Sequence, residues 1–411
     1  MLVTEATVSH PRLRLLTFTT LYPNAANLSH GIFVETRLRH LLASGEIESR
    51  VIAPVPWFPF RSATFGAYAV YAAAPRNEER HGIPIVHPRF LRLPKVGMTT
   101  APFTLANAAI GAARRMIASG YDFDVIDAHY FYPDGVAAIM LGRALGKPVV
   151  ITARGTDINL IPRHALPRRM ILGAARQCDA IITVCAALKD ALISLGADGS
   201  KVAVLRNGVD LDLFHPEDRA MAKSSFGVTR YALASVGHLV ERKGHDLVIG
   251  ALPALPDTEL FIAGAGPEAN RLQALARKLG VSERVRFLGP LPQDRLRTLY
   301  TAIDGLVLAS SREGWANVLL ESMACGTPVV ASNVWGTPEV VAAPEAGLLM
   351  DERSSPSIAE AVRRLRGSPP MREATRRYAE RFSWKDTTRG QIDLFSRVSA
   401  KSCAHARTRY V

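Results

Sequence analysis

Residues 304–332 read DGLVLASSREGWANVLLESMACGTPVVAS, and each segment of this stretch indicates a secondary-structure element. The apolar run over residues 304–310 predicts a buried parallel strand, and the polar residues 311–315 predict a turn. Residues 317–324 predict a short helix, which a glycine and a proline terminate, and residues 327–331 predict the next strand. A strand, a glycine-containing loop, a helix and a second strand in this order are typical of a parallel α/β sheet.

Two carboxylates, Glu313 and Glu321, stand eight positions apart in this stretch. Between them the backbone amides of Ala316, Asn317 and Val318 begin the predicted helix, where unpaired N–H donors bind anions such as phosphate. Taken alone, Glu313 is better explained as a solvated loop residue and Glu321 as a first-turn acid that the helix dipole favours. Together they fit a nucleotide sugar: the phosphates lie on the amides, the ribose hydroxyls donate to Glu321, and the sugar hydroxyls donate to Glu313.

The E-x7-E spacing in its setting EGWANVLLESMACGTPVV resembles the retaining glycosyltransferases of family 4, the glycosyl transferases of group 1. The resemblance covers nearly the whole chain. It implies the GT-B fold, an α/β fold of two doubly wound, Rossmann-like domains that face each other across a cleft. We expect an acceptor-side domain over residues 1–215, a domain that binds the nucleotide-sugar donor over residues 216–383, and a C-terminal helix over residues 384–411 that crosses back to the first domain.

Predicted strands and helices alternate from residue 124 onward, which indicates parallel sheets with ligands beyond the carboxyl ends of the strands. His129, the turn Arg154-Gly-Thr-Asp157 and Asn207 each follow a predicted strand. Where this chain has Arg154, the family often has a His that contacts the transferred sugar. The resemblance therefore implies a sugar contact for Arg154 and a role for Asp157 in orienting the acceptor or the loop. Arginine keeps the hydrogen-bond donor but is always charged, which leaves the identity of the sugar open.

The sequence GHLVERKG follows another predicted strand and places two adjacent cations, Arg242 and Lys243, beyond its end. Two such cations can hold a diphosphate without a metal, although a solvated basic turn is the alternative. The family pattern Gly-Arg…Arg-Lys is matched here except that His238 replaces the first Arg, and a His supplies that charge only when it is protonated. The resemblance also implies that Gly31, in the first loop, and Gly266 lie near the donor.

The composition of the chain sets further limits. With 411 residues, of which 48% are hydrophobic, the chain is too long for one core and suits two domains. The net charge of +13 attracts anionic partners, but the sequence contains no nucleic-acid-binding motif. No apolar run reaches the roughly 18 residues of a membrane-spanning helix. The two D-x-D patterns, at residues 122–124 and 210–212, are weak indicators of a metal site, and we expect none.

Residues 54–100 predict an irregular segment rich in Pro, aromatic residues and Arg. Trp57, Phe58 and Phe60 cluster beside Arg61, a combination that suits a membrane interface. A long loop that buries its own rings explains the same composition. We therefore expect a cytoplasmic protein, with peripheral contact on the inner face of a membrane as a second possibility.

These observations favour a retaining, metal-independent glycosyltransferase of polysaccharide biosynthesis that needs no cofactor. It would move a sugar from a nucleotide-diphosphate sugar to a lipid-linked or polysaccharide acceptor. The residues predicted to carry catalysis are Glu313, Arg242, Lys243, Arg154 and Asp157. The residues predicted to bind the donor are Gly31, His238, Gly266, Ala316, Asn317, Val318 and Glu321.

Two other functions are compatible with the same residues. A nucleotide-sugar epimerase of similar fold would need acid and base groups at the site but no acceptor. A non-catalytic nucleotide-sugar-binding subunit would bind without turnover. A dehydrogenase is disfavoured because the dinucleotide-binding glycines are missing. The sequence leaves open the sugar, the base, the acceptor and the oligomeric state.

Overall fold

The computed structural model describes residues 12–62, 64, 66–92 and 97–408. The chain divides into two compact units, and residues from three separate parts of the chain form the first of them. The first unit comprises residues 1–183, 191–205 and 388–411, and the second comprises residues 184–190 and 206–387. Within the described residues, no helix combines the length and the apolar composition needed to cross a membrane.

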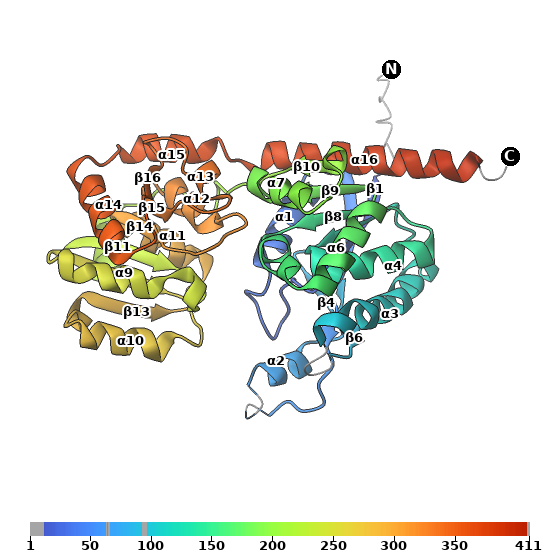
Figure 1. The fold of residues 1–411 in the computed structure, drawn as a ribbon, viewed down its shortest axis with the longest axis horizontal. Helices are drawn as coiled ribbons and strands as arrows, with labels where there is room; N and C mark the ends of the chain where they lie inside the picture. Colours follow the sequence, from blue (N-terminus) through green and yellow to red (C-terminus); the bar gives the residue numbers. More distant parts are fainter. Residues whose placement is uncertain (1–11, 63, 65, 93–96, 409–411) are drawn as a thin grey trace, which may run out of the picture. The chain divides into compact units, whose positions relative to one another are not determined.

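The first unit is built on an eight-stranded sheet with the order β10-β9-β8-β7-β1-β2-β5-β4 (Figure 1). Its strands are β1 Leu13–Phe18, β2 Ile47–Ile52, β4 Asn77–Arg80, β5 Ile83–Val86, β7 Val125–His129, β8 Val149–Ala153, β9 Ala180–Thr183 and β10 Val202–Val204. Neighbouring strands pair in parallel, except that β4 runs antiparallel to β5. Because the order runs outward from β1 in both directions, this sheet is doubly wound. The short strands β3 Val55–Pro56 and β6 Arg89–Phe90 form a separate parallel pair.

Helices cover this sheet and join its strands. The helical segments of the first unit are α1 Ile32–Leu42, α2 Ala67–Ala73, α3 Gly97–Ala118, the π-helical turn η2 Phe131–Gly135, α4 Val136–Leu145, α5 Thr156–Asn159, η3 Ile161–Arg163, α6 Ala165–Gln177 and η4 Gly199–Lys201. The helix α7 Ala186–Ser194 contributes residues to both units. The last helix, α16 Trp384–Thr408, packs Phe395 and Val398 into the hydrophobic core of the first unit.

The second unit contains a six-stranded, fully parallel sheet with the order β13-β12-β11-β14-β15-β16. Its strands are β11 Tyr231–Val236, β12 Thr258–Ala263, β13 Val285–Gly289, β14 Gly305–Leu308, β15 Val329–Ser332 and β16 Gly347–Met350. Its helical segments are α8 Arg219–Phe226, η5 Glu241–Lys243, α9 His245–Ala251, η6 Leu252–Ala254, α10 Ala269–Lys278, η7 Ser282–Arg284, α11 Gln293–Ala302, α12 Asn317–Ala324, α13 Thr337–Val340, α14 Ser355–Gly367 and α15 Arg372–Glu380. All residues of β14 and β15 are buried, as expected for strands covered on both faces.

The predicted α/β class with two doubly wound domains is therefore confirmed, but several elements differ from the expectation. The prediction of an irregular segment over residues 54–100 is wrong, because α2, β4 and β5 form there and α3 begins at Gly97. Aromatic residues, Pro and Arg obscure the periodicity of these elements in the sequence. The predicted C-terminal helix is α16, which runs from Trp384 to Thr408.

Candidate functional site

Residues 304–332 fold as a strand, a loop, a helix and a second strand in the second unit. Helix α12 begins at Asn317, and no side chain caps it. An uncapped start leaves the first amides of the helix as hydrogen-bond donors, so this end of α12 is suited to an anion. Glu313, in the loop before the helix, is buried with 8% of its surface exposed.

Lys243 and Glu313 lie together in the second unit. The Lys243 Nζ atom donates to Glu313 Oε1 at 2.5 Å, and the Ser310 hydroxyl donates to the same oxygen at 2.6 Å. Burial alone would raise the pKa of the Glu313 carboxyl, but the charge and hydrogen bond of Lys243 and the Ser310 hydroxyl outweigh it and hold that pKa below its ordinary value. Glu313 is therefore a fixed carboxylate whose second oxygen remains available as an acceptor.

Arg242 belongs to the same group of residues through its backbone and its charge. The amide of Ser311 donates to the Arg242 carbonyl at 2.8 Å, which joins the loop after β11 to the loop after β14. The Arg242 charge also contributes to the lowered pKa of Glu313. The two predicted cations and the first predicted carboxylate thus come from loops beyond two neighbouring strands of one sheet.

Close backbone contacts fix these loops. Gly244 has a φ of +69°, and a Cβ there would lie 2.2 Å from the Ala309 carbonyl oxygen. A Cβ on Gly266 would lie 2.3 Å from the Leu239 carbonyl oxygen. Glycine is required at both positions because any side chain would push the loops apart. Gly266 therefore has a packing function beside the loop that carries His238.

A cationic pocket of about 520 Å³ lies in the second unit. His238 and Arg242 line it together with Arg312 and Arg353, and Glu241 is the carboxylate among its lining residues. The guanidinium of Arg353 donates to the Ala309 carbonyl at 2.8 Å, which holds it in place. Three guanidinium groups around one pocket create a positive potential that suits phosphate.

Glu321 has a different environment from Glu313. Burial raises the pKa of its carboxyl to about 7, and the Tyr300 hydroxyl, which donates to Oε2 at 3.1 Å, lowers it only in part. The adjacent helix start is held by Asn207, whose amide donates to the Asn317 side-chain oxygen at 3.2 Å. The structure therefore joins Lys243 and Glu313 by a direct hydrogen bond and places the Arg242 charge near them, whereas Glu321 accepts its hydrogen bond from Tyr300.

In the first unit, His129 and Arg154 meet at the carboxyl ends of β7 and β8. Arg154 donates to His129 Nδ1 at 2.6 Å, so the ring proton resides on Nε2, which donates to Asp127 at 3.0 Å. Burial lowers the pKa of His129 to about 4, with Asp127 opposing this effect and Arg154 adding to it. The predicted sugar contact, Arg154, is thus a buried side chain engaged with a neutral His.

Asp157 is turned toward the backbone of its own loop. Its carboxylate accepts from the amides of Phe131 at 2.7 Å, Gly155 at 2.7 Å and Arg154 at 3.1 Å. Of the two roles predicted for Asp157, these contacts correspond to orienting the loop. Burial raises its pKa, and the backbone hydrogen bonds oppose that change.

Gly31 and Asp134 shape the first loop of the chain. Gly31 has φ +70°, and a Cβ there would lie 2.3 Å from the Leu21 carbonyl carbon, so the loop can close only with glycine. Asp134 accepts from the Thr20 amide at 2.6 Å and from the hydroxyls of Thr19 and Thr20. Burial nevertheless raises the pKa of Asp134 to about 7.

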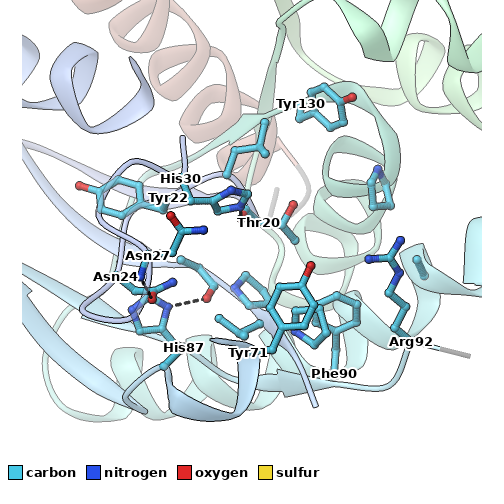
Figure 2. A pocket seen from close by; sticks show the side chains of 18 of the residues that line it. Thr20, Tyr22, Asn24, Asn27, His30, Tyr71, His87, Phe90, Arg92 and Tyr130 are labelled. Atoms are coloured by element: carbon cyan, nitrogen blue, oxygen red, sulfur yellow. Dashed lines mark hydrogen bonds between the residues drawn. The ribbon is translucent and has the colours of Figure 1, made fainter. Parts of the chain in front are cut away.

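This loop borders a cavity of about 380 Å³ in the first unit. Figure 2 shows Asn24, Asn27 and His30 on one side of the cavity and Phe90 and Arg92 on the other. The remaining lining residues include apolar side chains of α2 and α3. The cavity therefore combines amide and imidazole hydrogen-bonding groups with an apolar wall, which is the composition of a small-molecule site.

Several residues of these sites were not singled out from the sequence. Ser310 and Tyr300 hold the two predicted carboxylates, and Arg312 and Arg353 line the cationic pocket. Ser310 and Arg312 stand within three positions of Glu313, so their proximity was a usable signal. Tyr300 and Arg353 come from α11 and from the loop after β16, and the sequence carries no signal for those contacts. Among the residues that the structure describes, no group of three or more His, Cys, Asp or Glu side chains is placed to hold a metal ion.

Two family descriptions match this chain. Residues 216–382 match the family described as Glycosyl transferases group 1, and residues 66–213 match Glycosyltransferase Family 4. A protein of Mycobacteroides abscessus named D-inositol 3-phosphate glycosyltransferase is 31% identical over 300 residues, which is 68% of this chain and 67% of the relative. A protein of the same name from Mycolicibacterium smegmatis is 31% identical over 301 residues, 68% of each chain.

Solved structures show the same fold at lower identity. Sucrose-phosphate synthase of Thermosynechococcus elongatus has a TM-score of 0.78 and 18% identity, and the match covers 95% of this chain and all of the other. Anabaena HepE, solved with UDP and glucose, has a TM-score of 0.72 and 20% identity, and the match covers 94% of this chain and all of HepE.

Proposed function

This chain belongs to the group 1 glycosyltransferases of family 4 and is a glycosyltransferase, and we propose that it is a retaining, metal-independent enzyme that uses a nucleotide-diphosphate sugar. The observation that carries the proposal is the contact between Lys243 and Glu313 beside the uncapped start of α12. A cation and a helix start suit a diphosphate, and a fixed carboxylate suits sugar hydroxyls.

The donor proposal assigns a part of the ligand to each group. The diphosphate would contact Lys243, Arg242 and the amides of residues 316–318. The Lys243 ammonium has three N–H groups, so it can donate to Glu313 and to a phosphate oxygen at the same time. Glu313 would then hold the sugar, and Glu321, further along α12, would hold the ribose. We propose UDP as the first nucleotide to test because the neighbour HepE was solved with UDP-glucose.

The reaction breaks the bond between the sugar C1 atom and the oxygen of the β-phosphate, and that oxygen leaves with the electron pair. The acceptor hydroxyl oxygen forms the new bond to C1 on the face from which the phosphate departs, and its proton passes to the leaving phosphate. The charge that develops on this phosphate is the quantity that catalysis has to stabilise. Lys243, Arg242 and the helix start supply that stabilisation from the protein itself, which is why we propose that no metal ion or other cofactor is needed.

The acceptor is assigned to the first unit. We propose that the cavity of about 380 Å³ beside the Gly31 loop receives it, because amide, imidazole and apolar groups converge there. A lipid-linked or polysaccharide acceptor, as in polysaccharide biosynthesis, fits the apolar wall and the basic charge of the chain. The acceptor panel should also contain D-inositol 3-phosphate, because the relatives' names contain it. Peripheral attachment of a cytoplasmic enzyme to a membrane belongs to the same proposal.

A screen followed by product analysis tests this function. Thermal unfolding with UDP-, GDP-, ADP- and CDP-linked sugars identifies the donor, because a ligand at about 100 times its Kd stabilises the folded protein by about 2.7 kcal/mol. The selected donor is then incubated with and without members of the acceptor panel, and the products are followed by NMR. Transfer that requires the acceptor and keeps the anomeric configuration supports the proposal.

The same incubation separates the alternatives. A changed sugar nucleotide in the absence of any acceptor identifies an epimerase and contradicts sugar transfer. Tight donor binding without turnover across the whole panel identifies a binding subunit. An inverted product contradicts the retaining outcome while leaving glycosyl transfer in place. Activity that is lost in EDTA and restored by Mg²⁺ contradicts metal independence.

A further inference from the structure

Large aromatic side chains are exposed in one part of the first unit. In the described part of the chain, every large aromatic residue found exposed lies between residues 57 and 103. Two large aliphatic residues in the same stretch are exposed as well. We call this set the docking face: Trp57, Phe60, Tyr68, Leu91, Met98 and Phe103. Apolar residues that are exposed singly are normal, but a cluster of this kind marks an interaction surface.

Contacts through Phe58 and Phe90 connect members of the docking face. The Phe58 ring contacts both Phe60, at a centroid distance of 6.0 Å, and Tyr68, at 5.2 Å. The amide of Trp57 donates to the Phe90 carbonyl at 2.7 Å, which places Trp57 beside Leu91 where β3 and β6 end. These segments include α2, which lies at the end of the first unit opposite α16 in Figure 1. Trp57, Phe60, Tyr68 and Leu91 therefore lie in one region of the first unit.

The charge around the docking face is positive. Residues 57–103, which contain the docking face, hold six Lys or Arg and two Glu. Glu78, one of the two, is occupied by His87 and by the Ala25 amide. Arg61, Arg76 and Arg92 are exposed. The pKa of the nearby Arg89 is lowered by burial and then by the charges of Arg76 and Arg61, which shows that these cations share one region.

We propose that the docking face binds the surface of an anionic phospholipid bilayer. Trp, Tyr and Phe insert at the boundary between head groups and acyl chains, and arginines among them pair with lipid phosphates. Cations near an anionic membrane are attracted to its surface, so the three exposed arginines add to the apolar insertion. The inference deepens the peripheral attachment in the proposed function and does not depend on the identity of the sugar or the nucleotide.

The positive charge of the docking face makes a second copy of the chain an unfavourable partner for it. Two copies joined through this face would bring Arg61, Arg76 and Arg92 against the same residues of the other copy, and like charges in contact are repulsive. A bilayer with anionic head groups meets both requirements, an apolar layer for the rings and negative charge for the arginines. A protein partner with acidic and apolar residues is the competing occupant, and the test below separates the two.

The docking face also borders the cavity of the first unit. Met98 and Arg92 line the cavity and are exposed, and Tyr71, whose ring lies 6.2 Å from that of Tyr68, lines it as well. Figure 2 shows Tyr71, Phe90 and Arg92 close together at this side of the cavity. An acceptor held in the membrane by its lipid would therefore reach the cavity from the edge of the attached surface.

Vesicle sedimentation of the full-length protein tests the inference. We expect stronger binding to phosphatidylcholine vesicles that contain phosphatidylglycerol than to phosphatidylcholine alone, and weaker binding as salt is raised. The test variant combines Trp57→Ser, Phe60→Ser and Arg61→Glu, three exposed positions outside the cavity lining. It should lose about tenfold or more in its partition coefficient on anionic vesicles, since every 1.4 kcal/mol is tenfold and two rings and one cation are removed.

A matched control variant carries the same kinds of change in the second unit: Met221→Ser, Met371→Ser and Arg277→Glu, all at exposed positions. It should bind vesicles like the wild-type protein. Circular dichroism and donor-nucleotide binding, measured on both variants, should remain unchanged and thereby separate a failed fold or a failed donor site from a failed docking face. Equal binding by the wild-type protein and the test variant, or no preference for anionic vesicles, overturns the proposal. So does a wild-type oligomer or protein complex that the test variant disrupts while vesicle binding stays the same.

Discussion

Lys243 and Glu313 show how much of the site can be deduced from single residues. Each is recognisable from its position: one is a cation in the loop after a strand, and the other is an acid eight positions before a second acid. Their direct contact at 2.5 Å could not be deduced, because it depends on two loops that are far apart in the sequence. The same holds for Tyr300, which reaches Glu321 from a different helix.

Replacing Lys243 by Ala should lower turnover much more than donor affinity. The ammonium is proposed to stabilise charge that develops on the leaving phosphate, and removing one such group costs roughly 2–4 kcal/mol of barrier, or about 30- to 1,000-fold in turnover. Steady-state kinetics of Lys243→Ala checks this. The exposed Lys278 on α10 provides the control, and Lys278→Ala should behave like the wild-type protein. Turnover of Lys243→Ala within about threefold of wild type would show that this role is wrong.

Glu321 should release protons when the nucleotide binds. Burial raises its pKa to about 7, so at pH 7 about half of the molecules carry a proton there. Ribose hydroxyls that donate to the carboxylate favour its ionised form and lower the pKa, so binding at pH 7 should release up to about half a proton. Calorimetry of UDP binding in phosphate and in Tris measures the release from the difference in heat. Glu321→Gln should abolish that difference, and a net uptake of protons by the wild-type protein contradicts the assignment.

At the scale of elements, the alternation of strands and helices was predictable wherever apolar runs were clean. The strands β14 and β15 and the helix α12 fall where the sequence predicts them. In the segment 54–100 the prediction failed, because Pro and aromatic residues interrupt the periodicity and because β4 and β5 gain their stability from neighbouring strands rather than from local preference. Helix α6, rich in Arg, was missed for a related reason, since its buried stripe is narrow.

The turn between η5 and α9 should tolerate no side chain at Gly244. Gly244 and Gly280 both have positive φ, at +69° and +67°, but a Cβ on Gly244 would lie 2.2 Å from the Ala309 carbonyl oxygen, whereas nothing lies within 4 Å of a Cβ on Gly280. Gly280→Ala should cost about 1–2 kcal/mol from the backbone conformation alone. Gly244→Ala should cost more and should also lower turnover, because it displaces the loop that carries Lys243.

Urea unfolding and kinetics of the two variants separate these effects. The informative quantity is the difference between Gly244→Ala and Gly280→Ala, because the two share the cost of a left-handed backbone and differ in the contact with Ala309. Equal stability and equal turnover of the two variants would mean that the close packing of these loops does not position the site.

At the scale of the whole molecule, carboxyls and histidines whose pKa values are shifted by burial have opposite effects on stability. Burial raises the pKa of Asp134 and of Glu321 to about 7 and lowers that of His129 and of His245 to about 4. A carboxyl whose pKa is raised in the folded protein contributes stability that is fully present below its unfolded pKa. This contribution is lost as pH rises through the folded pKa. A His whose pKa is lowered in the folded protein contributes stability that is fully present above its unfolded pKa. This contribution is lost as pH falls through the folded pKa. Between pH 4.5 and 6.5 the two effects therefore offset each other.

Replacing one of these acids by a neutral residue should change how stability depends on pH. The Glu321 carboxyl has an unfolded pKa of 4.5 and a folded pKa of about 7, so it makes the wild-type protein less stable as pH rises between these values. Glu321→Gln removes this contribution. The stability of the variant relative to the wild-type protein should therefore increase over this range and level off above it. Urea midpoints from pH 4.5 to 8 measure the trend. A relative stability that is constant with pH, or that decreases, would show that the Glu321 carboxyl is not held in its neutral form.

The central claim is that one site in the second unit holds the donor, and a crystal structure of the protein with UDP tests it most directly. The account predicts the diphosphate within hydrogen-bonding distance of Lys243 Nζ and of the amides at the start of α12, with the ribose hydroxyls at Glu321. UDP bound anywhere that leaves these groups without a contact, as in the cavity of the first unit, would contradict it.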